Sequence, residues 1–539
     1  SKKKSVRRNG FADTDNNSTD TEIIDYSKTV DTAKSPHNSK NGTGGTEPTD
    51  PVEPVLRVTS FEENAALTME RLSSIQIGNP NADGGVAEIV SYNADTKEAY
   101  VVNGQDGLLY RFTVAETGLT QKDSKDMRGL IDGFTYGDMT SVAVDTVNDR
   151  IAVALQAAGY ADNGRIALLD YKFNLVASYE VGVQPDMVTF THDGRMILSA
   201  NEGEPRNGYG EGTVDPAGSV SVIDLMDESV TNAGFEAFDS AALAADGVLI
   251  GKVNGELNSA AADLEPEYIA VSSDDSKAYV SLQEANAIAT VDLESETVTS
   301  VKSMGFKDLS LTENAIDLVE DNKYAPKTYP NAVGVYMPDA ISIFEVGGVS
   351  YLVTANEGDA REWGDYANEA KETLTASDDT SAEKVRVLDK TCTTVPDDTK
   401  EYLYGGRSFA IYNADTMSLV YESGNDFEEK TAGYLPDYFN CSNDNIAIDD
   451  RSTKKGPEAE SITVGQIGNK TYAFIALERI GGVMVYDVTD PANSTYVNYI
   501  NTRDFSADIK EDVSPEGLCF LSLDGKPMLL AACEVSGTV

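Results

Sequence analysis

Acidic side chains recur at two fixed places in a pattern of short apolar runs that repeats along the chain. The first place follows a proline at the start of a run, and its residues are Asp186, Glu267, Asp339, Glu458 with Glu460, and Glu516. The second place follows the end of the next run, and its residues are Glu202, Glu204, Glu284, Glu357, Asp359, Glu362, Glu478 and Glu534. Equivalent residues of a repeat occupy equivalent positions around the repeated structure. The spacing therefore predicts two rings of carboxylates about one axis.

Carboxylates that share one place repel each other unless they are protonated or bridged by cations. Oxygen ligands of this kind suit hard cations, so the pattern predicts a Ca²⁺ site, with Mg²⁺ or another divalent metal as the alternative. A second interpretation stays open. Acidic residues at strand ends are often solvated, and a repeat copies residues by duplication whether or not they bind anything.

Three arginines lie beside these acidic residues in the sequence, Arg361, Arg407 and Arg479. A guanidinium next to a metal-bound carboxylate suits a phosphate group or another oxyanion, because the metal and the arginine together neutralise its charge. The competing interpretation is that the arginines form salt bridges inside the acidic ring. The chain has only two histidines, His37 and His192, which argues against a Ser-His-Asp triad or a three-histidine zinc site.

The elements that must position these residues are short β-strands. Runs rich in Val, Ile, Ala, Tyr and Thr are separated by Asp-Gly, Asn-Gly, Gly-Gly or Asp-Asp turns, in the order strand, turn, strand, loop, strand. That order is typical of a propeller blade, and seven copies are found. The predicted fold is an all-β, seven-bladed β-propeller. A strand near residues 72–77 is expected to complete the last blade and close the ring.

Two kinds of polar segment interrupt this pattern. Residues 1–58 are rich in Ser, Thr, Asn, Asp and Pro, which predicts a disordered tail or linker, so that the propeller domain spans residues 59–539. Two long polar stretches, 363–404 and 426–456, are predicted as loop insertions in the fifth blade, on a face where binding surfaces are common.

The overall charge excludes several classes of partner. The 539 residues contain 42 Lys and Arg against 90 Asp and Glu, a formal net charge of -48. Such a chain is repelled by nucleic-acid phosphates and anionic lipid, so neither is an expected partner, and it attracts metal cations. No run of 18 apolar residues occurs, so no transmembrane segment is expected.

The cysteine count and the glycosylation signals are compatible with an extracellular protein. The even count of four cysteines favours two disulfides, a cross-strand Cys519–Cys533 pair and a Cys392–Cys441 pair between the insertions, with free buried thiols as the alternative. Sequons that permit glycosylation occur at Asn16, Asn17, Asn41, Asn440, Asn469 and Asn493.

Several motifs resemble those of the choice-of-anchor I proteins, over about residues 60–539. They are Pro185-Asp186-Met187, Ala200-Asn201-Glu202-Gly203-Glu204-Pro205, Glu265-Pro266-Glu267-Tyr268, Ala355-Asn356-Glu357-Gly358-Asp359-Ala360-Arg361-Glu362, Gly405-Gly406-Arg407-Ser408-Phe409, Lys455-Gly456-Pro457-Glu458, Ala476-Leu477-Glu478-Arg479-Ile480-Gly481-Gly482 and Glu534-Val535-Ser536-Gly537-Thr538-Val539. That family is similar to mesenchyme-specific cell-surface glycoproteins and to atypical alkaline phosphatases of marine microbes. Cys533 departs from the family pattern, which usually has Asn before this Glu.

The resemblance implies a secreted or surface-anchored propeller, with calcium-dependent phosphatase activity in some members and a mineral or matrix role in others. The leading hypothesis is a calcium-dependent phosphomonoesterase, in which Glu202, Glu357, Asp359, Glu478 and Glu534 hold metal and Arg361, Arg407 and Arg479 grip the phosphate. The alternative is a non-enzymatic surface or matrix protein that binds Ca²⁺, mineral or neighbouring subunits. A glycan-binding module is a third possibility.

Overall fold

The computed structural model describes residues 4–8, 21–25, 59–62 and 67–539. Its contacts divide the chain into two units, Ser1–Val55 and Leu56–Val539. In the first unit, β1 (Lys4–Arg8) pairs antiparallel with β2 (Thr21–Asp25). The rest of the predicted tail lies outside the described residues, so its disorder and the boundary at residue 58 stay predictions.

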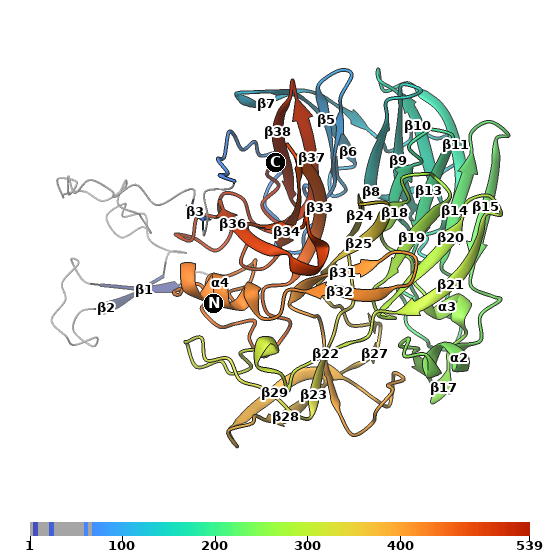
Figure 1. The fold of residues 1–539 in the computed structure, drawn as a ribbon. Helices are drawn as coiled ribbons and strands as arrows, with labels where there is room; N and C mark the ends of the chain where they lie inside the picture. Colours follow the sequence, from blue (N-terminus) through green and yellow to red (C-terminus); the bar gives the residue numbers. More distant parts are fainter. Residues whose placement is uncertain (1–3, 9–20, 26–58, 63–66) are drawn as a thin grey trace, which may run out of the picture. The chain divides into compact units, whose positions relative to one another are not determined.

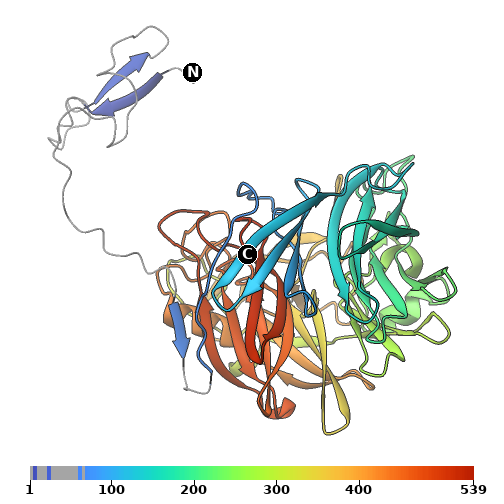
Figure 2. The same cartoon turned by 90° about the horizontal axis from the view of Figure 1, so that it is seen from above.

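The second unit is all-β, as predicted, and its main sheets are antiparallel and follow one another along the chain (Figures 1 and 2). We name the successive sheets A to G. Sheet A contains β4 (Val90–Asn93), β5 (Glu98–Asn103), β6 (Leu108–Ala115) and β7 (Gly118–Asp126). Sheet B contains β8 (Tyr136–Asp145), β9 (Arg150–Ala157), β10 (Asn163–Asp170) and β11 (Leu175–Val183). Sheet C contains β12 (Pro185–Phe190), β13 (Met196–Asn201), β14 (Ser219–Asp224) and β15 (Ser229–Gly234).

The remaining sheets continue the same order. Sheet D contains β18 (Ile269–Val271), β19 (Lys277–Leu282), β20 (Ala287–Asp292) and β21 (Thr297–Ser303). Sheet E contains β24 (Ile341–Val346), β25 (Val349–Asn356), β31 (Ser408–Asn413) and β32 (Ser418–Glu422). Sheet F contains β33 (Ala459–Ile467), β34 (Lys470–Leu477), β35 (Val483–Asp487), β36 (Thr495–Asn501) and, at its outer edge, β3 (Thr59–Glu62). Sheet G contains β37 (Pro515–Leu523) and β38 (Lys526–Cys533).

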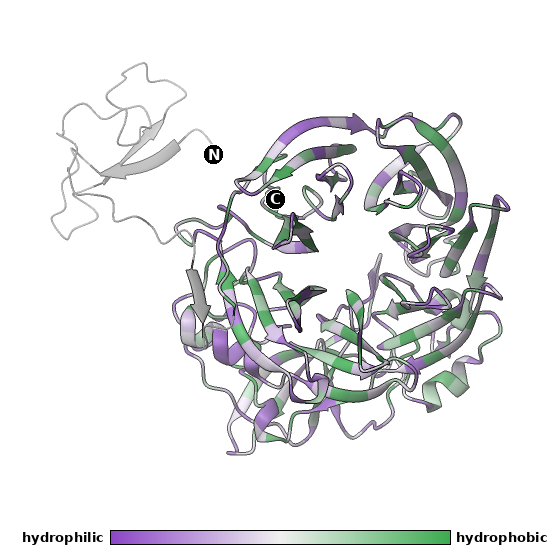
Figure 3. Cartoon of the chain, turned by 45° about the horizontal axis from the view of Figure 1, so that its top comes forward, coloured by the Kyte–Doolittle hydropathy of each residue, from purple (hydrophilic) through white to green (hydrophobic). Residues whose placement is uncertain are grey.

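The first strands of these sheets form a closed ring. Each contacts the first strand of the next sheet, in the order β4, β8, β12, β18, β24, β33 and β37, and β37 lies against β4. Figure 3 shows the sheets arranged around this axis. The apolar cores lie between neighbouring sheets: Leu198 and Val220 of sheet C, for example, share a buried cluster with Val280 and Ala287 of sheet D. The result is a propeller-like fold.

The local sequence explains why the strands turn where they do. After β12, the Thr191 hydroxyl accepts a hydrogen bond from Met196 N, and Gly194 adopts a positive φ of 68° that a glycine tolerates without strain. The third strand of the same sheet, β14, reads Ser-Val-Ser-Val-Ile-Asp and is buried along its whole length. Such β-branched residues suit a strand that is packed on both faces.

Only residues 75–77 of the predicted closing segment 72–77 pair, and they do so through an isolated bridge at Gln76 and not as a regular strand. Val539 N donates to Ile75 O at 2.9 Å, and Ile75 N donates to Val539 O at 3.0 Å. Thr538 bridges both Gln76 and Cys533. Residues near the start of the second unit therefore extend sheet G through residues 537–539.

The insertions are not simply loops. A five-stranded sheet, ordered β22-β23-β30-β29-β28, contains β22 (Phe306–Asp308), β23 (Ala332–Val335), β28 (Glu369–Thr375), β29 (Ser381–Leu388) and β30 (Glu401–Leu403), with β23 and β30 parallel. The stretch 363–404 thus contains regular strands, and 426–456 begins with α4 (Asp426–Tyr434). Alternating apolar residues in β29, such as Val385 and Val387, are buried and stabilise this sheet.

Smaller elements connect the sheets. They are α2 (Ser240–Ala245), α3 (Ala260–Asp263), the hairpin of β16 (Lys252–Val253) and β17 (Glu256–Leu257), the hairpin of β26 (Glu362–Trp363) and β27 (Tyr366–Ala367), and 3-10 turns at Thr312–Asn314 and Pro491–Asn493. Among the described residues, every helix is too short or too polar to cross a membrane.

The disulfide prediction was wrong, because all four cysteines are free. The turn between β37 and β38 is centred one and a half residues earlier than a Cys519–Cys533 pair requires, since Leu523 pairs with Lys526. Cys519 consequently faces Leu530, while Cys533 pairs with Pro515.

The sequons differ in accessibility. Asn440 is buried, and its amide donates to Glu428 and Ser452, so it is closed to glycosylation in the folded chain. Asn469 and Asn493 are exposed. Asn16, Asn17 and Asn41 lie outside the described residues.

Candidate metal centre

β-Bulges aim acidic side chains at the start of several first strands. The register shifts between Pro185 and Val188, between Ala459 and Ile462, and between Pro515 and Gly517. The acids in these bulges are Asp186, Glu460 and Glu516. A bulge places an extra residue on one strand and redirects its side chain, which is why bulges are common beside functional sites. In sheet F the ring position therefore belongs to Glu460, two residues after the proline-linked Glu458.

The acidic ring has more members than the proline pattern predicts. Glu88 precedes β4 and Asp138 lies on β8, which gives each sheet an acid at the start of its first strand: Glu88, Asp138, Asp186, Glu267, Asp339, Glu460 and Glu516. Burial, followed by repulsion from Asp138 and Glu534, raises the pKa of Glu88 well above its ordinary value. Glu88 and Asp138 escaped sequence analysis because neither follows a proline. The signal that could have found them is an acid directly before or within the first apolar run.

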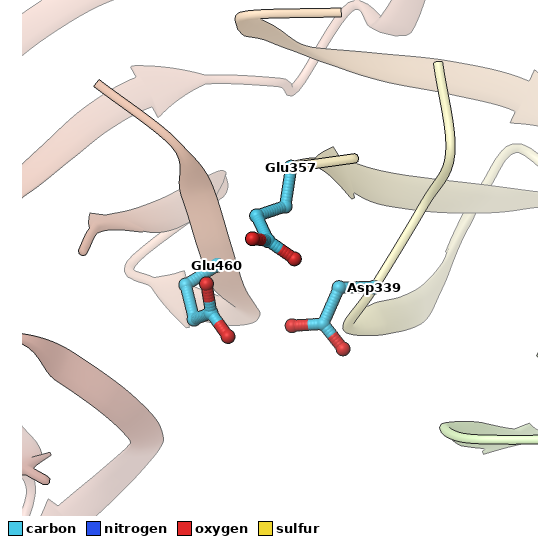
Figure 4. A group of neighbouring side chains, drawn as sticks. All are labelled: Asp339, Glu357 and Glu460. Carbon is cyan, nitrogen blue, oxygen red and sulfur yellow. The ribbon is translucent and has the colours of Figure 1, made fainter. Parts of the chain in front are cut away.

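Two predicted ligands, Asp339 and Glu357, form a compact group with Glu460, another acid of the predicted rings. One carboxylate oxygen from each of Asp339, Glu357 and Glu460 lies within 4.8 Å of the other two, and Figure 4 shows these side chains pointing toward one another from three separate segments. Within the described residues, neither Asp339 nor Glu460 has a lysine or arginine within ion-pair distance. We call this group the bare site.

The bare site is electrostatically unbalanced. Burial, and then repulsion from Glu357 and Asp339, raises the pKa of Glu460 well above its ordinary range. Burial and the Glu357 charge do the same to the pKa of Asp339. The Glu460 Oε2 atom is buried without a hydrogen-bond partner. A buried oxygen that lacks a partner costs free energy unless a ligand satisfies it.

A second group shares Glu357 with the bare site and is electrostatically balanced. It consists of Glu357, Glu458 and Glu478, again with oxygens within 4.8 Å of one another. The Lys455 ammonium lies 3.1 Å from Glu357 Oε1 and 3.4 Å from Glu458 Oε2. Arg479 lies 2.9 Å from both Glu458 and Glu478. We call this group the paired site.

Glu458 has more basic partners than any other acid of the bare and paired sites. It is fully buried, and it pairs with Arg451 as well as with Arg479 and Lys455. Although burial acts in the opposite direction, these three cations lower the pKa of Glu458 well below its ordinary value. Glu458 is therefore a carboxylate held by the protein's own cations.

Burial dominates the titration of the other acids. It raises the pKa of Glu357 to about 8, against the opposing effect of Lys455. It raises the pKa of Glu478 to about 7, although Arg479 opposes the shift. Asp186 and Glu284 are raised to a pKa of about 7 in the same way.

Two further predicted ligands carry unsatisfied oxygens. Glu267 and Glu284 are 8 % and 6 % exposed, and the Oε2 atom of each is buried without a hydrogen-bond partner. Burial, and then repulsion from Glu284 and Asp339, raises the pKa of Glu267 well above its ordinary value. The uncompensated negative charge thus extends from the bare site into sheet D.

Four further predicted ligands, Glu202, Glu204, Glu534 and Asp359, have partners. Arg206 lies 3.7 Å from Glu202 and 2.7 Å from Glu204. Glu534 accepts a hydrogen bond of 3.1 Å from the Ser514 hydroxyl. Asp359 is exposed and lies 2.9 Å from Lys455.

The three predicted phosphate-binding arginines do not come together. The Arg361 side chain is 1 % exposed and pairs with Asp263 at 3.0 Å and Glu265 at 3.2 Å. Arg407 is equally enclosed: it pairs with Glu428 at 2.5 Å and donates to three backbone carbonyls, those of Asp317, Ser452 and Lys454. Both therefore form internal salt bridges, but their partners Asp263, Glu265 and Glu428 lie outside the two predicted acidic rings. Arg479, whose side chain is 21 % exposed, is the arginine that lies on the acidic ring.

The bare site meets the chemical requirements of a hard divalent cation. Its donors are all carboxylate oxygens, it includes the unpartnered Glu460 Oε2, and no protein cation neutralises Asp339 or Glu460 in the described part of the chain. Ca²⁺ takes six to eight oxygen ligands, commonly supplied by such carboxylates together with water. Asp339, Glu357 and Glu460 are the residues that would hold it.

Two curated proteins are similar to parts of this chain. Over 159 residues the chain is 31 % identical to Gigasin-3a of Magallana gigas, a match that covers 26 % of this chain and 56 % of that protein. Over 109 residues it is 28 % identical to the mesenchyme-specific cell surface glycoprotein of Strongylocentrotus purpuratus, covering 18 % and 14 % of the two chains. Both matches span less than two thirds of the relative.

Solved structures give only a loose likeness. The hydrazine synthase of Kuenenia stuttgartiensis is matched with a TM-score of 0.41 and 10 % identity, over 85 % of this chain and 98 % of that one. The Cps50 (Swd1) β-propeller domain of Myceliophteria thermophila is matched with a TM-score of 0.40 and 8 % identity, over 86 % and 98 % of the two chains.

A family model decides the relationship. The model of the choice-of-anchor I domain matches residues 88–491, about three quarters of the chain. The matched segment includes the bare site, the paired site and most of the acidic ring. The chain belongs to the choice-of-anchor I family.

Proposed function

We propose that this protein is an extracellular or cell-surface β-propeller of seven blades that binds a divalent cation, Ca²⁺ in the first place, through its axial carboxylates. Sheets A to G are the blades, and residues 537–539 and 75–77 add to sheet G. The name of one relative, the mesenchyme-specific cell surface glycoprotein, supports the location. Exposed Asn469 and Asn493 would permit glycosylation there.

One observation carries the cation proposal. Glu460 Oε2 is buried without a partner beside Asp339 and Glu357, while the adjacent paired site is neutralised by Lys455 and Arg479. The fold thus compensates some of its axial charge with its own side chains and leaves the rest. A divalent cation at the bare site would relieve the repulsion that raises these pKa values.

Calorimetric titration with Ca²⁺ tests the proposal. We expect saturable binding by the chelator-treated full chain and at least about tenfold weaker binding by Glu460→Gln. The matched control is Glu345→Gln, which removes an exposed acid at the far end of the strand that follows Asp339. Wild-type protein without saturable binding of Ca²⁺ or Mg²⁺ would refute the proposal.

The second candidate function is hydrolysis of phosphate monoesters. Arg479 favours it, because this partly exposed guanidinium lies beside Glu478 and Glu458, next to the bare site. A cation bound at the bare site would supply Lewis acidity and charge neutralisation there. Arg479 and Lys455 would orient an oxyanion by charge-assisted hydrogen bonds.

Phosphate release from a chromogenic monoester distinguishes the two candidates. The enzyme hypothesis predicts turnover that depends on added Ca²⁺ and falls at least about 100-fold in Arg479→Gln. Saturable Ca²⁺ binding without any release of phosphate would leave a non-enzymatic role, in which the acidic face holds cations and contacts mineral, matrix or neighbouring subunits.

A further inference from the structure

Three glutamates at the acidic end of sheet D each have one buried oxygen without a hydrogen-bond partner. The atoms are Glu265 Oε1, Glu267 Oε2 and Glu284 Oε2, and the residues are 2 %, 8 % and 6 % exposed. None of the three belongs to the bare site or to the paired site. A buried carboxylate oxygen costs free energy unless a donor or a cation satisfies it. Sheet D therefore has an unsatisfied requirement for positive charge that is separate from the bare site.

A protein cation compensates one of these glutamates. Arg361 Nε lies 3.2 Å from Glu265 Oε2, and Arg361 Nη1 lies 3.0 Å from Asp263 Oδ1. In the part of the chain that the structure describes, Glu267 and Glu284 have no lysine or arginine within ion-pair distance. Arg361 thus compensates Glu265, while Glu267 and Glu284 remain without a positive partner.

The backbone pairing at the start of sheet D brings Glu267 close to Glu284. Glu267 N donates to Ser281 O at 3.1 Å, and Ser281 N donates to Tyr268 O at 2.9 Å, so the residues before β18 lie beside the end of β19. Glu284 follows the end of β19 by two residues. Burial, and then repulsion from Glu284 ahead of any other acid, raises the pKa of Glu267. The two carboxylates therefore lie together at the acidic end of this sheet.

Gln283 connects this pair of carboxylates to the bare site. It directly precedes Glu284, and its side-chain amide donates to Glu357 Oε2 at 2.7 Å. The amide is neutral, and Glu267 and Glu284 are not among the carboxylates of the bare site. A cation held by Glu267 and Glu284 would therefore be additional to a cation at the bare site.

We infer that Glu267 and Glu284 hold a second divalent cation, bound by their two carboxylates and by water. Mg²⁺ is the ion that this donor set fits best, because Mg²⁺ keeps several of its waters and binds through one or two carboxylates, whereas Ca²⁺ takes six to eight oxygen ligands. The cation would satisfy Glu267 Oε2 and Glu284 Oε2. The inference rests on the proposed cation binding and adds to it a second ion with a different coordination.

Calorimetric titration with Mg²⁺ tests the second site. The chelator-treated full chain with Glu460→Gln, which lacks a ligand of the bare site, should bind about one Mg²⁺ per chain. Adding Glu267→Gln or Glu284→Gln to this parent variant should weaken the binding at least about tenfold and remove the rise in Tm that Mg²⁺ gives the parent. The matched control adds Glu294→Gln, which alters an exposed acid in the turn between β20 and β21 of the same sheet and should leave both readouts unchanged.

Failure of this inference is distinguishable from failure of the proposed function. Mg²⁺ binding that is equal in the control, Glu267→Gln and Glu284→Gln variants would overturn the second site and leave Ca²⁺ binding by the wild type intact. A parent variant that binds no Mg²⁺, beside wild-type protein that binds Ca²⁺ saturably, would also overturn the second site. Wild-type protein that binds neither ion would refute the proposed function and the second site together.

Discussion

The Lys455 ammonium lies 3.1 Å from Glu357 Oε1, and Glu357 is the one carboxylate common to the bare site and the paired site. Lys455 therefore neutralises Glu357 on one side. On the other side, Asp339 and Glu460 have no basic partner among the described residues. The protein's own basic side chains thus neutralise some of the carboxylates around the axis, and the other carboxylates are the ones that we propose bind a cation.

Removing the Lys455 charge should make the protein more dependent on Ca²⁺. Lys455→Met leaves Glu357 and Asp359 without their ammonium partner, so the free energy of unfolding of the chelator-treated protein should fall by about 3 kcal/mol. Added Ca²⁺ should raise the Tm of the variant more than that of the wild type. Lys454→Met, which alters the neighbouring lysine that pairs with Asp450, is the control. An equal Ca²⁺ effect in wild type and Lys455→Met would contradict this prediction.

Neutralising Glu460 should have opposite effects with and without cation. In chelator, at a pH high enough to ionise Glu460, Glu460→Gln removes a buried charge that repels Glu357 and Asp339, so thermal unfolding should occur at a higher temperature than in the wild type. In Ca²⁺ the variant lacks a ligand, and the stabilisation by the metal should shrink. The prediction fails if Glu460→Gln lowers the Tm in chelator.

The raised pKa values predict that the cation-free protein loses stability as pH rises. The pKa values of Glu357, at about 8, and of Asp186, Glu284 and Glu478, at about 7, exceed those of unfolded glutamate and aspartate. The native state thus holds protons that the unfolded chain releases, and this contribution is lost between about pH 5 and pH 8. Urea unfolding in chelator should show a lower free energy of unfolding at pH 8 than at pH 5.5. Ca²⁺ should reduce the difference, whereas a flat or rising profile would show that these acids do not titrate as described.

Arg407 should matter for folding and leave turnover unaffected. It is 3 % exposed and bonded to Glu428 and to three carbonyls, so Arg407→Met leaves a buried carboxylate unpaired and should cost about 3 to 5 kcal/mol of stability. Any phosphatase activity of the folded fraction should stay within about twofold of the wild type. The amount of folded protein is measured by circular dichroism at the assay temperature. A loss of kcat much larger than the loss of folded protein would show that Arg407 takes part in the reaction.

Much of this architecture follows from the sequence, because strand patterns repeat. The proline before Asp186, Asp339 and Glu516 marks the start of a first strand, and an acid at that point reaches the axis. The family, the all-β class and the pairing of residues 75–77 were predictable in this way. The number of blades stays a prediction, since sheet G contains only two regular strands.

Other features depend on tertiary packing that no repeat encodes. The bulge between Ala459 and Ile462 places Glu460 at the ring position, while Glu458 pairs with three basic side chains. The sequence shows two acids two residues apart and does not reveal which of them takes the ring position. Arg361 and Arg407 are adjacent to ring acids in sequence, but distant carboxylates, Asp263 and Glu428, hold them. The Cys519–Cys533 disulfide was wrongly predicted because a turn shifted by one and a half residues changes every cross-strand partner.

The metal content of the purified full chain tests the central claim most directly. Protein equilibrated with Ca²⁺ and passed through a desalting column should retain at least one Ca²⁺ per chain by mass spectrometry, and Glu460→Gln should retain measurably less. Wild-type protein that retains no more calcium than the buffer blank, with binding also absent by calorimetry, would contradict the account.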